Sequence, residues 1–287
     1  MQQTEGFDTL HANDFPLVSI ITVVLNGQRH LECAIRSVLE QSYKNIEYII
    51  IDGGSSDSSI DIIRSFDVAI DFWISEKDRG IYHAMNKGLN YARGELVGIL
   101  NCDDYYHPES VKTVVQAWLN NKADIVYGDM ILRDEKLGME RLLSIDVQSN
   151  RASQRLHYVH PTVFVSRKLY DLKRFDERLQ IAADYKLMSQ FLIEGAGVIK
   201  VDCVLATMRR GGVSQRLSFE IPQIDLQLFG VWVAFKSLSK IIFVIVPIKF
   251  IGKLLDIFSL RDKVNIIRWR AQGGWRIQSS TCRSVET

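Results

Sequence analysis

The sequence predicts an α/β fold built on a mostly parallel sheet, and three features of its first hundred residues lead to that prediction. Short apolar runs alternate with segments of helical periodicity, as in chains whose strands are joined by crossover helices. The run at 96–100 is apolar throughout, which is typical of a strand buried on both faces. The runs end in polar or glycine residues, and ligands bind at the edge that such strand ends form.

The individual elements follow from local patterns, taken in order along the chain. A β-branched run that stops at an Asn-Gly pair predicts the first strand, and apolar residues at three- and four-residue spacing predict the first helix. Gly94 is a helix stop signal, and Pro108 suits the first turn of a helix. These patterns predict strands at 18–25, 46–51, 71–75, 96–100, 124–132, 162–165 and 198–205, and helices at 31–40, 58–66, 82–93, 109–120 and 185–194.

The first turn excludes the dinucleotide-binding fold. Residues 26–29 are Asn-Gly-Gln-Arg, whereas that fold requires a Gly-x-Gly-x-x-Gly loop after its first strand. Asp103 and Asp104 follow the strand at 96–100, and two adjacent carboxylates are costly to crowd together without a positive charge nearby. A divalent cation held together with substrate phosphates would meet that need, which predicts a metal–diphosphate site. A solvated acidic loop is the alternative.

The cysteines and the amino terminus favour a cytoplasmic protein. The four cysteines lie far apart and form no Cys-x-x-Cys pair, so we expect neither a zinc site nor a disulfide framework. This pattern fits a reducing compartment. Residues 1–16 are polar and lack the basic and then apolar order of a secretory signal.

Five motifs resemble those of family 2 glycosyltransferases in their order and spacing, and they lie at residues 20–26, 51–57, 75–88, 100–104 and 183–185. The chain is most similar to the bacterial members that build exopolysaccharide or O-antigen units, such as those of colanic acid synthesis. The resemblance covers residues 16–215 and implies an inverting enzyme with the GT-A fold, a Rossmann-like, mixed but mostly parallel sheet flanked by helices. Residues 216–287 would then form a helical, basic C-terminal appendage.

The resemblance assigns residues to the nucleotide-sugar donor. It implies that Thr22 and Asn26 lie beside the nucleotide at the end of the first strand. Asp52 resembles the carboxylate that accepts a hydrogen bond from a uracil ring, so uridine diphosphate is the expected nucleotide. Asp78 would help to bind the base, and Arg79 would contact a phosphate.

The same resemblance predicts a divalent metal ion, Mn2+ or Mg2+. Asp103 resembles the metal-binding carboxylate of the family's Asp-x-Asp signature, but Asn101 stands here in place of the first acid. An amide oxygen can still bind the metal or the ribose, although it brings less charge. Arg209 begins a basic, glycine-bearing loop at 209–214 that can fold over a phosphate.

Asp184 resembles the catalytic base of the family. The reaction needs a base because an acceptor hydroxyl has a pKa far above neutrality and must lose its proton as it attacks the anomeric carbon. From the residues alone, the alternative is that Asp184 only caps the helix after it. His160 resembles a histidine that precedes the base in close relatives and would hold the acceptor or the diphosphate. A structural hydrogen-bonding role for His160 is the alternative.

The C-terminal segment combines positive charge with apolar runs. Between residues 236 and 283 there are ten basic residues and two acids, so this segment carries +8 while the rest of the chain carries −7. The apolar runs at 226–235 and 241–248 are too short to read as spanning helices. Lysines spaced four residues apart beside them suit an anionic membrane surface. We therefore expect peripheral attachment to the inner face of the cytoplasmic membrane; packing on the catalytic domain or dimerisation is the alternative.

The leading interpretation is an inverting glycosyltransferase that moves a sugar from a nucleotide-sugar donor to a glycan or polyprenyl-linked acceptor in exopolysaccharide or lipopolysaccharide synthesis. A nucleotidyltransferase is disfavoured, because no glycine- and lysine-rich loop follows the first strand. A catalytically degenerate sugar-nucleotide-binding module is the non-enzyme alternative. Nucleic acid is not expected as a partner, because the apolar runs within the basic segment suit a lipid surface better.

Overall fold

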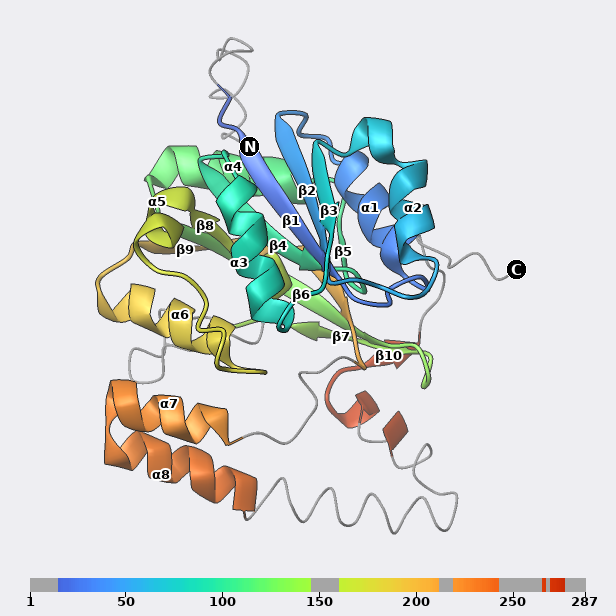
Figure 1. Cartoon of the computed structure of the whole chain (residues 1–287). Helices are drawn as coiled ribbons and strands as arrows, with labels where there is room; N and C mark the ends of the chain where they lie inside the picture. Colours follow the sequence, from blue (N-terminus) through green and yellow to red (C-terminus); the bar gives the residue numbers. More distant parts are fainter. Residues whose placement is uncertain (1–14, 146–159, 212–218, 243–264, 267–268, 277–287) are drawn as a thin grey trace, which may run out of the picture.

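The computed structural model describes residues 15–145, 160–211, 219–242, 265–266 and 269–276, which include an α/β domain built on one sheet (Figure 1). The strands of this sheet follow the order β10-β7-β6-β8-β4-β1-β2-β3, with β9 paired to β6 and β5 paired to β9. They are β1 (Val18–Val24), β2 (Ile46–Asp52), β3 (Phe72–Ser75), β4 (Leu96–Asn101), β5 (Tyr105–Tyr106), β6 (Ile125–Asp134), β7 (Met139–Leu143), β8 (Phe164–Ser166), β9 (Val198–Arg209) and β10 (Trp275–Arg276).

The sheet is parallel in its first half and mixed in its second half. Strands β4, β1, β2 and β3 are parallel neighbours, joined through the helices α1 (Leu31–Leu39), α2 (Ser59–Ser65) and α3 (Ile81–Tyr91). Strand β8 runs antiparallel to β4 and β6, and β7 runs antiparallel to β6. The short link from β6 to β7 allows no crossover helix, which enforces the antiparallel pairing. This architecture confirms the predicted mixed, mostly parallel α/β class.

Helices cover both faces of the sheet and divide its core into two layers. Side chains of α3 and α6 (Ala183–Ile193), such as Met85 and Phe191, pack on one face together with Ile21. Side chains of α1 and α4 (Ser110–Asn121), such as Ile35 and Val115, pack on the other face. Because neighbouring residues of a strand point to opposite faces, all seven residues of β1 are buried. In β4, residues 96–100 are buried as well, which confirms the burial on both faces predicted for this run.

The register of the parallel strands gathers their polar ends at one edge of the sheet. Val24 lies opposite Asp52, and Asp52 lies opposite Ser75. On the other side of β1, Val23 lies opposite Asn101. The loops that leave β1, β2, β3 and β4 therefore start side by side, and this edge carries the residues that the sequence singled out.

The C-terminal part forms a helical hairpin below α6, made of α7 (Glu220–Phe229) and α8 (Val231–Lys240) (Figure 1). The apolar run expected at 226–235 is divided between the two helices at Gly230, whose φ of 86° suits glycine. Most of the second run, residues 243–248, lies outside the described residues. None of the described helices is long and apolar enough to cross a membrane.

Two further features differ from expectation. Cys33 is disulfide-bonded, whereas Cys102 and Cys203 are free; the sequence had led us to expect no disulfide framework. Helix α5 (Arg167–Leu172) and the short strands β5 and β7 were not anticipated. Elements this short have too few residues to show a periodicity of their own.

Gly94 allows the loop before β4 to pass directly against β1. A Cβ at this position would lie 2.4 Å from the backbone nitrogen of Ser19 and 2.8 Å from the carbonyl oxygen of Leu17. We expect Gly94→Ala to lower the free energy of unfolding by about 1–3 kcal/mol, because backbone atoms must shift to admit the methyl group. Urea unfolding measures this loss. Gly197→Ala is the matched control, since its Cβ would have no neighbour nearer than 3.6 Å; equal midpoints for the two variants would contradict the prediction.

Candidate functional site

The loops after β1 and β2 interlock at the polar edge of the sheet. The backbone N–H of Asn26 donates to the hydroxyl of Ser55 at 2.7 Å, and the Asn26 side chain accepts from the N–H of Ser56 at 2.9 Å. Next to them, the N–H of Gln28 donates to Asp57 at 3.0 Å. Asn26 has a φ of 53°, a left-handed conformation that asparagine tolerates better than most residues. The predicted site residue Asn26 thus fixes one loop against the other.

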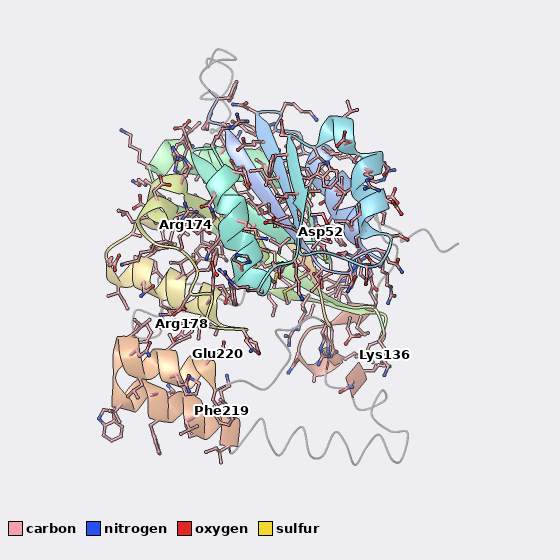
Figure 2. The ribbon with its side chains drawn as sticks, in the orientation of Figure 1. Asp52, Lys136, Arg174, Arg178, Phe219 and Glu220 are labelled. Carbon is pink, nitrogen blue, oxygen red and sulfur yellow. The ribbon has the colours of Figure 1, made fainter. Side chains whose placement is uncertain are left out.

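Asp52 shapes the turn after β2 from a fully buried position. Its carboxylate accepts hydrogen bonds from the N–H groups of Gly54 and Ser55 at 3.1 and 3.0 Å and from the hydroxyl of Ser75 at 2.7 Å. Asp78 is partly exposed and packs over this turn, so close that a Cβ on Gly53 would lie 2.2 Å from its Oδ2. Asp52 and Asp78 are the two carboxylates expected near the base of a nucleotide. Asp78 is the accessible one of the two, whereas Asp52 orders the turn beneath it (Figure 2 labels Asp52).

Thr22 lies in the interior of the sheet and not at its edge. It is fully buried, and its hydroxyl is 3.1 Å from the hydroxyl of Tyr48. Position 22 is two residues short of the end of β1, and its side chain points into the core between β1 and β2. The sequence had led us to expect Thr22 beside a nucleotide, whereas the structure places its side chain in the core.

Arg209, at the end of β9, forms hydrogen bonds with the acidic turn after β4. Its backbone N–H donates to Asp104 Oδ1 at 3.0 Å, and its guanidinium donates to the carbonyl oxygen of Asp103 at 2.7 Å and to Glu135 at 2.8 Å. The guanidinium also lies 5.0 Å from the centre of the Tyr105 ring. Arg209 is the last residue of β9 and is only 6% exposed, because pairing with β6 draws it into the sheet. Residues 212–214 of the expected phosphate-binding loop lie outside the described residues, so that role stays a prediction.

Burial raises the pKa of both carboxyl groups in this turn. For Asp104 the nearby Asp103 adds to the rise, and the hydrogen bond and charge of Arg209 oppose it. For Asp103 the backbone and Arg209 oppose the effect of burial. Asp104 is 1% exposed and faces Arg209, whereas Asp103 is partly exposed. An anionic pair in this environment would be stabilised by a cation on the side of Asp103.

The residues of the turn fit a divalent cation that is shared with a substrate. The side-chain oxygen of Asn101 is buried and has no hydrogen-bond partner among the described residues. It is therefore available as a metal ligand two residues before Asp103. Within the described part of the chain, no group of three or more His, Cys, Asp or Glu side chains could hold a metal ion. Mg2+ and Mn2+ are commonly bound by one or two carboxylates and the phosphates of a substrate. The donor set here suits that mode and not an all-protein cage.

Asp184 lies in the first turn of α6, where the hydroxyl of Tyr82 from α3 donates to its Oδ1 at 3.2 Å. Burial raises the pKa of Asp184 more than the neighbouring His160 and the hydrogen bonds lower it. The N-cap of α6 is Ala182, so Asp184 is inside the helix and is not its cap residue. Asp184 is thus a buried carboxylate of raised pKa in the first turn of α6 that faces Tyr82 of α3.

His160 lies near Asp184, as its sequence position suggested. Both of its ring nitrogens are buried without a hydrogen-bond partner in the described structure, and its ring packs edge-on against Phe175 at 6.5 Å. Burial lowers the pKa of His160, which favours the neutral imidazole. No hydrogen-bond partner among the described residues supports a structural role for His160, and its neutral ring could form a hydrogen bond with a ligand.

Helix α3 connects the segment around Arg79 with Asp184 and with the loop at 175–177, a connection that sequence reasoning missed. The Asn86 side chain donates to the carbonyl oxygen of Phe175 at 2.9 Å and to Glu177 at 3.0 Å, and it accepts from the N–H of Phe175 at 3.1 Å. Arg79, just before α3, is exposed and pairs with Glu177 at 2.7 Å. Tyr82 and Asn86 belong to the motif at 75–88, which was the available signal for their importance.

Sequence comparison relates the chain to bacterial glycosyltransferases. Residues 19–179 match the family described as Glycosyl transferase family 2. An uncharacterized glycosyltransferase of Mycobacterium tuberculosis H37Rv is 29% identical over 231 residues, which cover 75% of this chain and 83% of the relative. A PGL/p-HBAD biosynthesis glycosyltransferase of Mycobacterium bovis BCG is 27% identical over 176 residues, which cover 59% of this chain and 67% of the relative.

Structural comparison finds the same fold in solved glycosyltransferases. S. aureus TarS in complex with UDP-GlcNAc superposes with a TM-score of 0.61 at 16% identity, over 74% of this chain and 65% of TarS 1-349. The mannosyltransferase PcManGT from Pyrobaculum calidifontis, in complex with GDP-Man and Mn2+, gives 0.55 at 20% identity, over 74% of this chain and 61% of that one. The chain thus spans less than two thirds of each solved chain. At these identities the likeness concerns the fold, and it confirms the expected GT-A class.

Arg209 and its neighbour Arg210 offer a matched pair of variants. We expect Arg209→Met to lower the free energy of unfolding by at least about 2 kcal/mol, because it leaves buried acceptors without their donor. Arg210→Met should cost about 1 kcal/mol or less, since the Arg210 side chain is 39% exposed, which weakens its ion pair with Asp134 and its contact with the Trp269 ring. Urea unfolding of the two variants measures the difference. A loss for Arg209→Met no larger than that for Arg210→Met would contradict the buried supporting role.

Proposed function

This chain belongs to glycosyl transferase family 2, and we propose that it is an inverting enzyme that moves a sugar from a nucleoside-diphosphate sugar to a hydroxyl group of an acceptor. The observation that carries the proposal is the placement of Asp184. This carboxylate has a raised pKa, receives a hydrogen bond from Tyr82 and lies near the neutral His160. A base is what the acceptor oxygen needs at that point of the reaction.

The proposed chemical step uses Asp184 at the acceptor and the residues Asp103 and Asn101 near the diphosphate. Asp184 takes the proton of the acceptor hydroxyl while the acceptor oxygen forms a bond to the anomeric carbon. The bond from that carbon to the diphosphate oxygen breaks on the opposite face, and its electron pair leaves with the nucleoside diphosphate. One in-line displacement of this kind inverts the anomeric configuration. A bound Mn2+ or Mg2+ would offset the negative charge on the diphosphate, and Asp103 with the Asn101 oxygen would hold it.

The donor side is proposed to be formed by the interlocked loops at the sheet edge. Asn26 and the turn organised by Asp52 would support the nucleotide, Asp78 would bind the base, and the exposed Arg79 would contact a phosphate. Uridine diphosphate is the proposed nucleotide, and the fold shared with TarS, which was solved with UDP-GlcNAc, supports this choice. A guanosine donor is the second possibility, since PcManGT was solved with GDP-Man.

The acceptor is proposed to be a glycan or polyprenyl-linked glycan used in cell-surface polysaccharide synthesis. The Mycobacterium bovis relative is named for PGL/p-HBAD biosynthesis, which is in keeping with a surface glycoconjugate. Residues 16–215 would form the catalytic domain, and the basic residues of 216–287 would hold it on the inner face of the cytoplasmic membrane. The charge of +8 between residues 236 and 283 supports this location.

Donor turnover tests the proposed reaction. Purified protein with a panel of nucleotide sugars, membrane extract as acceptor source and Mn2+ should release nucleoside diphosphate from one donor, and chelator should suppress the release. Asp184→Asn should lower this rate by about 10²–10⁴-fold, the range typical of a lost general base. Asp61→Asn, at an acid that is 79% exposed, is the control and should keep the wild-type rate. If no donor is consumed while nucleoside diphosphate still binds, the degenerate binding module becomes the better interpretation.

The pH dependence tests the role of Tyr82. Because Asp184 acts in its ionised form and burial raises its pKa, activity should be lost as the pH falls through a value above that of an ordinary aspartate. The Tyr82 hydroxyl stabilises the ionised form, so Tyr82→Phe should raise that pKa and move the acidic limb of kcat/KM up by about one pH unit. Tyr91→Phe, at a 42% exposed tyrosine stacked on Phe72, should leave the limb in place. An unchanged limb in Tyr82→Phe would contradict this role.

A further inference from the structure

The helical hairpin α7–α8 is joined to the turn that carries Asp184. Glu220, the first residue of α7, accepts hydrogen bonds from the N–H groups of Gln180, Ile181 and Ala182 at 2.8, 2.9 and 2.9 Å. Ala182 is the N-cap residue of α6, and Gln180 and Ile181 precede it. The carboxylate of Glu220 therefore binds the backbone of the turn that leads into α6. In Figure 2, Glu220 lies between the loop that carries Arg178 and the start of α7.

A second buried contact joins the hairpin to α6 on the other side of Asp184. Asp225 of α7 is fully buried, and its carboxylate accepts hydrogen bonds from Tyr185 of α6 and Ser237 of α8. Tyr185 also packs with Ala182 and Ile224 in a small apolar cluster between α6 and α7. We call Glu220 and Asp225, together with the groups that donate hydrogen bonds to them, the latch. It holds residues 180–182 and 185, which lie on either side of position 184 in the sequence.

The side of α8 that faces away from α7 is apolar and basic. Val231, Trp232 and Phe235 are 70%, 85% and 62% exposed. Trp232, Lys236 and Lys240 follow one another at four-residue spacing, and the two lysines are exposed as well. We call these five residues the outer face of α8. Leu226 of α7 is 53% exposed as well, and in the catalytic domain Val68 and Leu172 are exposed on different elements.

We propose that the outer face of α8 docks on an anionic lipid bilayer and that the latch transmits this docking to the turn of Asp184. A helix of ten residues is too short to span a bilayer but can lie in its interface with its apolar side buried. A tryptophan beside lysines suits that interface, because the ring enters the headgroup region while the amines stay with the phosphates. The strong basic charge that follows α8 in sequence selects an anionic surface. Two copies of this face would bring like charges together, which disfavours self-association.

Docking has a consequence for the site because the latch is short and buried. A bilayer that binds the latched hairpin more tightly than a hairpin that has moved away stabilises the latched arrangement. The N–H groups of residues 180–182 then stay bonded to Glu220. Asp184 is held at the membrane side of the domain, where the hydroxyl of a lipid-linked acceptor would lie. This consequence for catalysis rests on the proposed function, whereas docking and its transmission do not.

Vesicle flotation tests the docking surface. The full chain should float with vesicles of phosphatidylglycerol and phosphatidylethanolamine at low salt, and it should not float with vesicles of phosphatidylcholine alone. Trp232→Ser with Phe235→Ser should abolish flotation. Val68→Ser with Leu172→Ser is the matched control, because it removes two equally exposed apolar residues elsewhere, and it should float like the wild type. Failure of the wild type to float, or flotation of the Trp232 and Phe235 variant, would overturn the proposal. If the wild type is a dimer and the Trp232 and Phe235 variant is a monomer, the outer face of α8 binds a second copy of the chain instead.

Hydrogen exchange tests the transmission through the latch. Anionic vesicles should slow amide exchange at residues 180–182 by about fivefold or more, the lower end of coupling between two sites. Tyr185→Phe should still float but should lose most of this slowing, since it removes one donor to Asp225; Ser237→Ala provides a second variant if the first is not folded by circular dichroism. Unchanged exchange in floated wild type, or equal slowing in both variants, would overturn the transmission. Neither measurement uses sugar transfer, so its failure is distinct from failure of the proposed reaction.

Discussion

Two adjacent carboxylates at the end of a buried strand impose the constraint on which the rest of the site depends. The chain places Asp103 and Asp104 where burial raises the pKa of both, so their ionised forms require positive charge close by. Arg209 supplies this charge through its contacts with Asp104 and with the carbonyl oxygen of Asp103, while the Asp103 residue stays partly exposed. A cation and a diphosphate can therefore complete a charge balance that the protein alone provides only in part.

This constraint explains why the sheet has a second, mixed half. Arg209 reaches the acidic turn because β9 runs beside β6 and also pairs with the short strand β5 that follows the turn. The parallel half provides the interlocked loops around Asn26 and Asp52. The two halves meet at β4, which ends in Asn101 and leads into the acidic turn. Strand β9 runs parallel to β6, and its last residue is Arg209, so the arginine reaches the edge of the sheet at which β4 ends.

The position of Asp184 depends on contacts from both sides of α6. Helix α3 starts next to Arg79 and reaches Asp184 through Tyr82, so both lie against one helix. From the other side, Glu220 binds the backbone of the turn that leads into α6. The hairpin that the sequence marks as a basic appendage is therefore part of the frame that holds this carboxylate. Its exposed apolar face and its buried carboxylate belong to the same two helices.

The sequence by itself determined the elements and the motif positions, because these depend on local patterns. The apolar stripe of α1, the run of β4 and the polar residues after each strand were all read from spacing, and the register then gathered them at one edge. Only the tertiary structure decided what several side chains do. Thr22 faces Tyr48 in the core, and Arg209 is bonded behind the acids. The partner of each side chain comes from a distant part of the chain: Asp104 and Arg209 are 105 positions apart. Spacing along the sequence carries no record of such contacts, because they exist only once the strands and helices have packed.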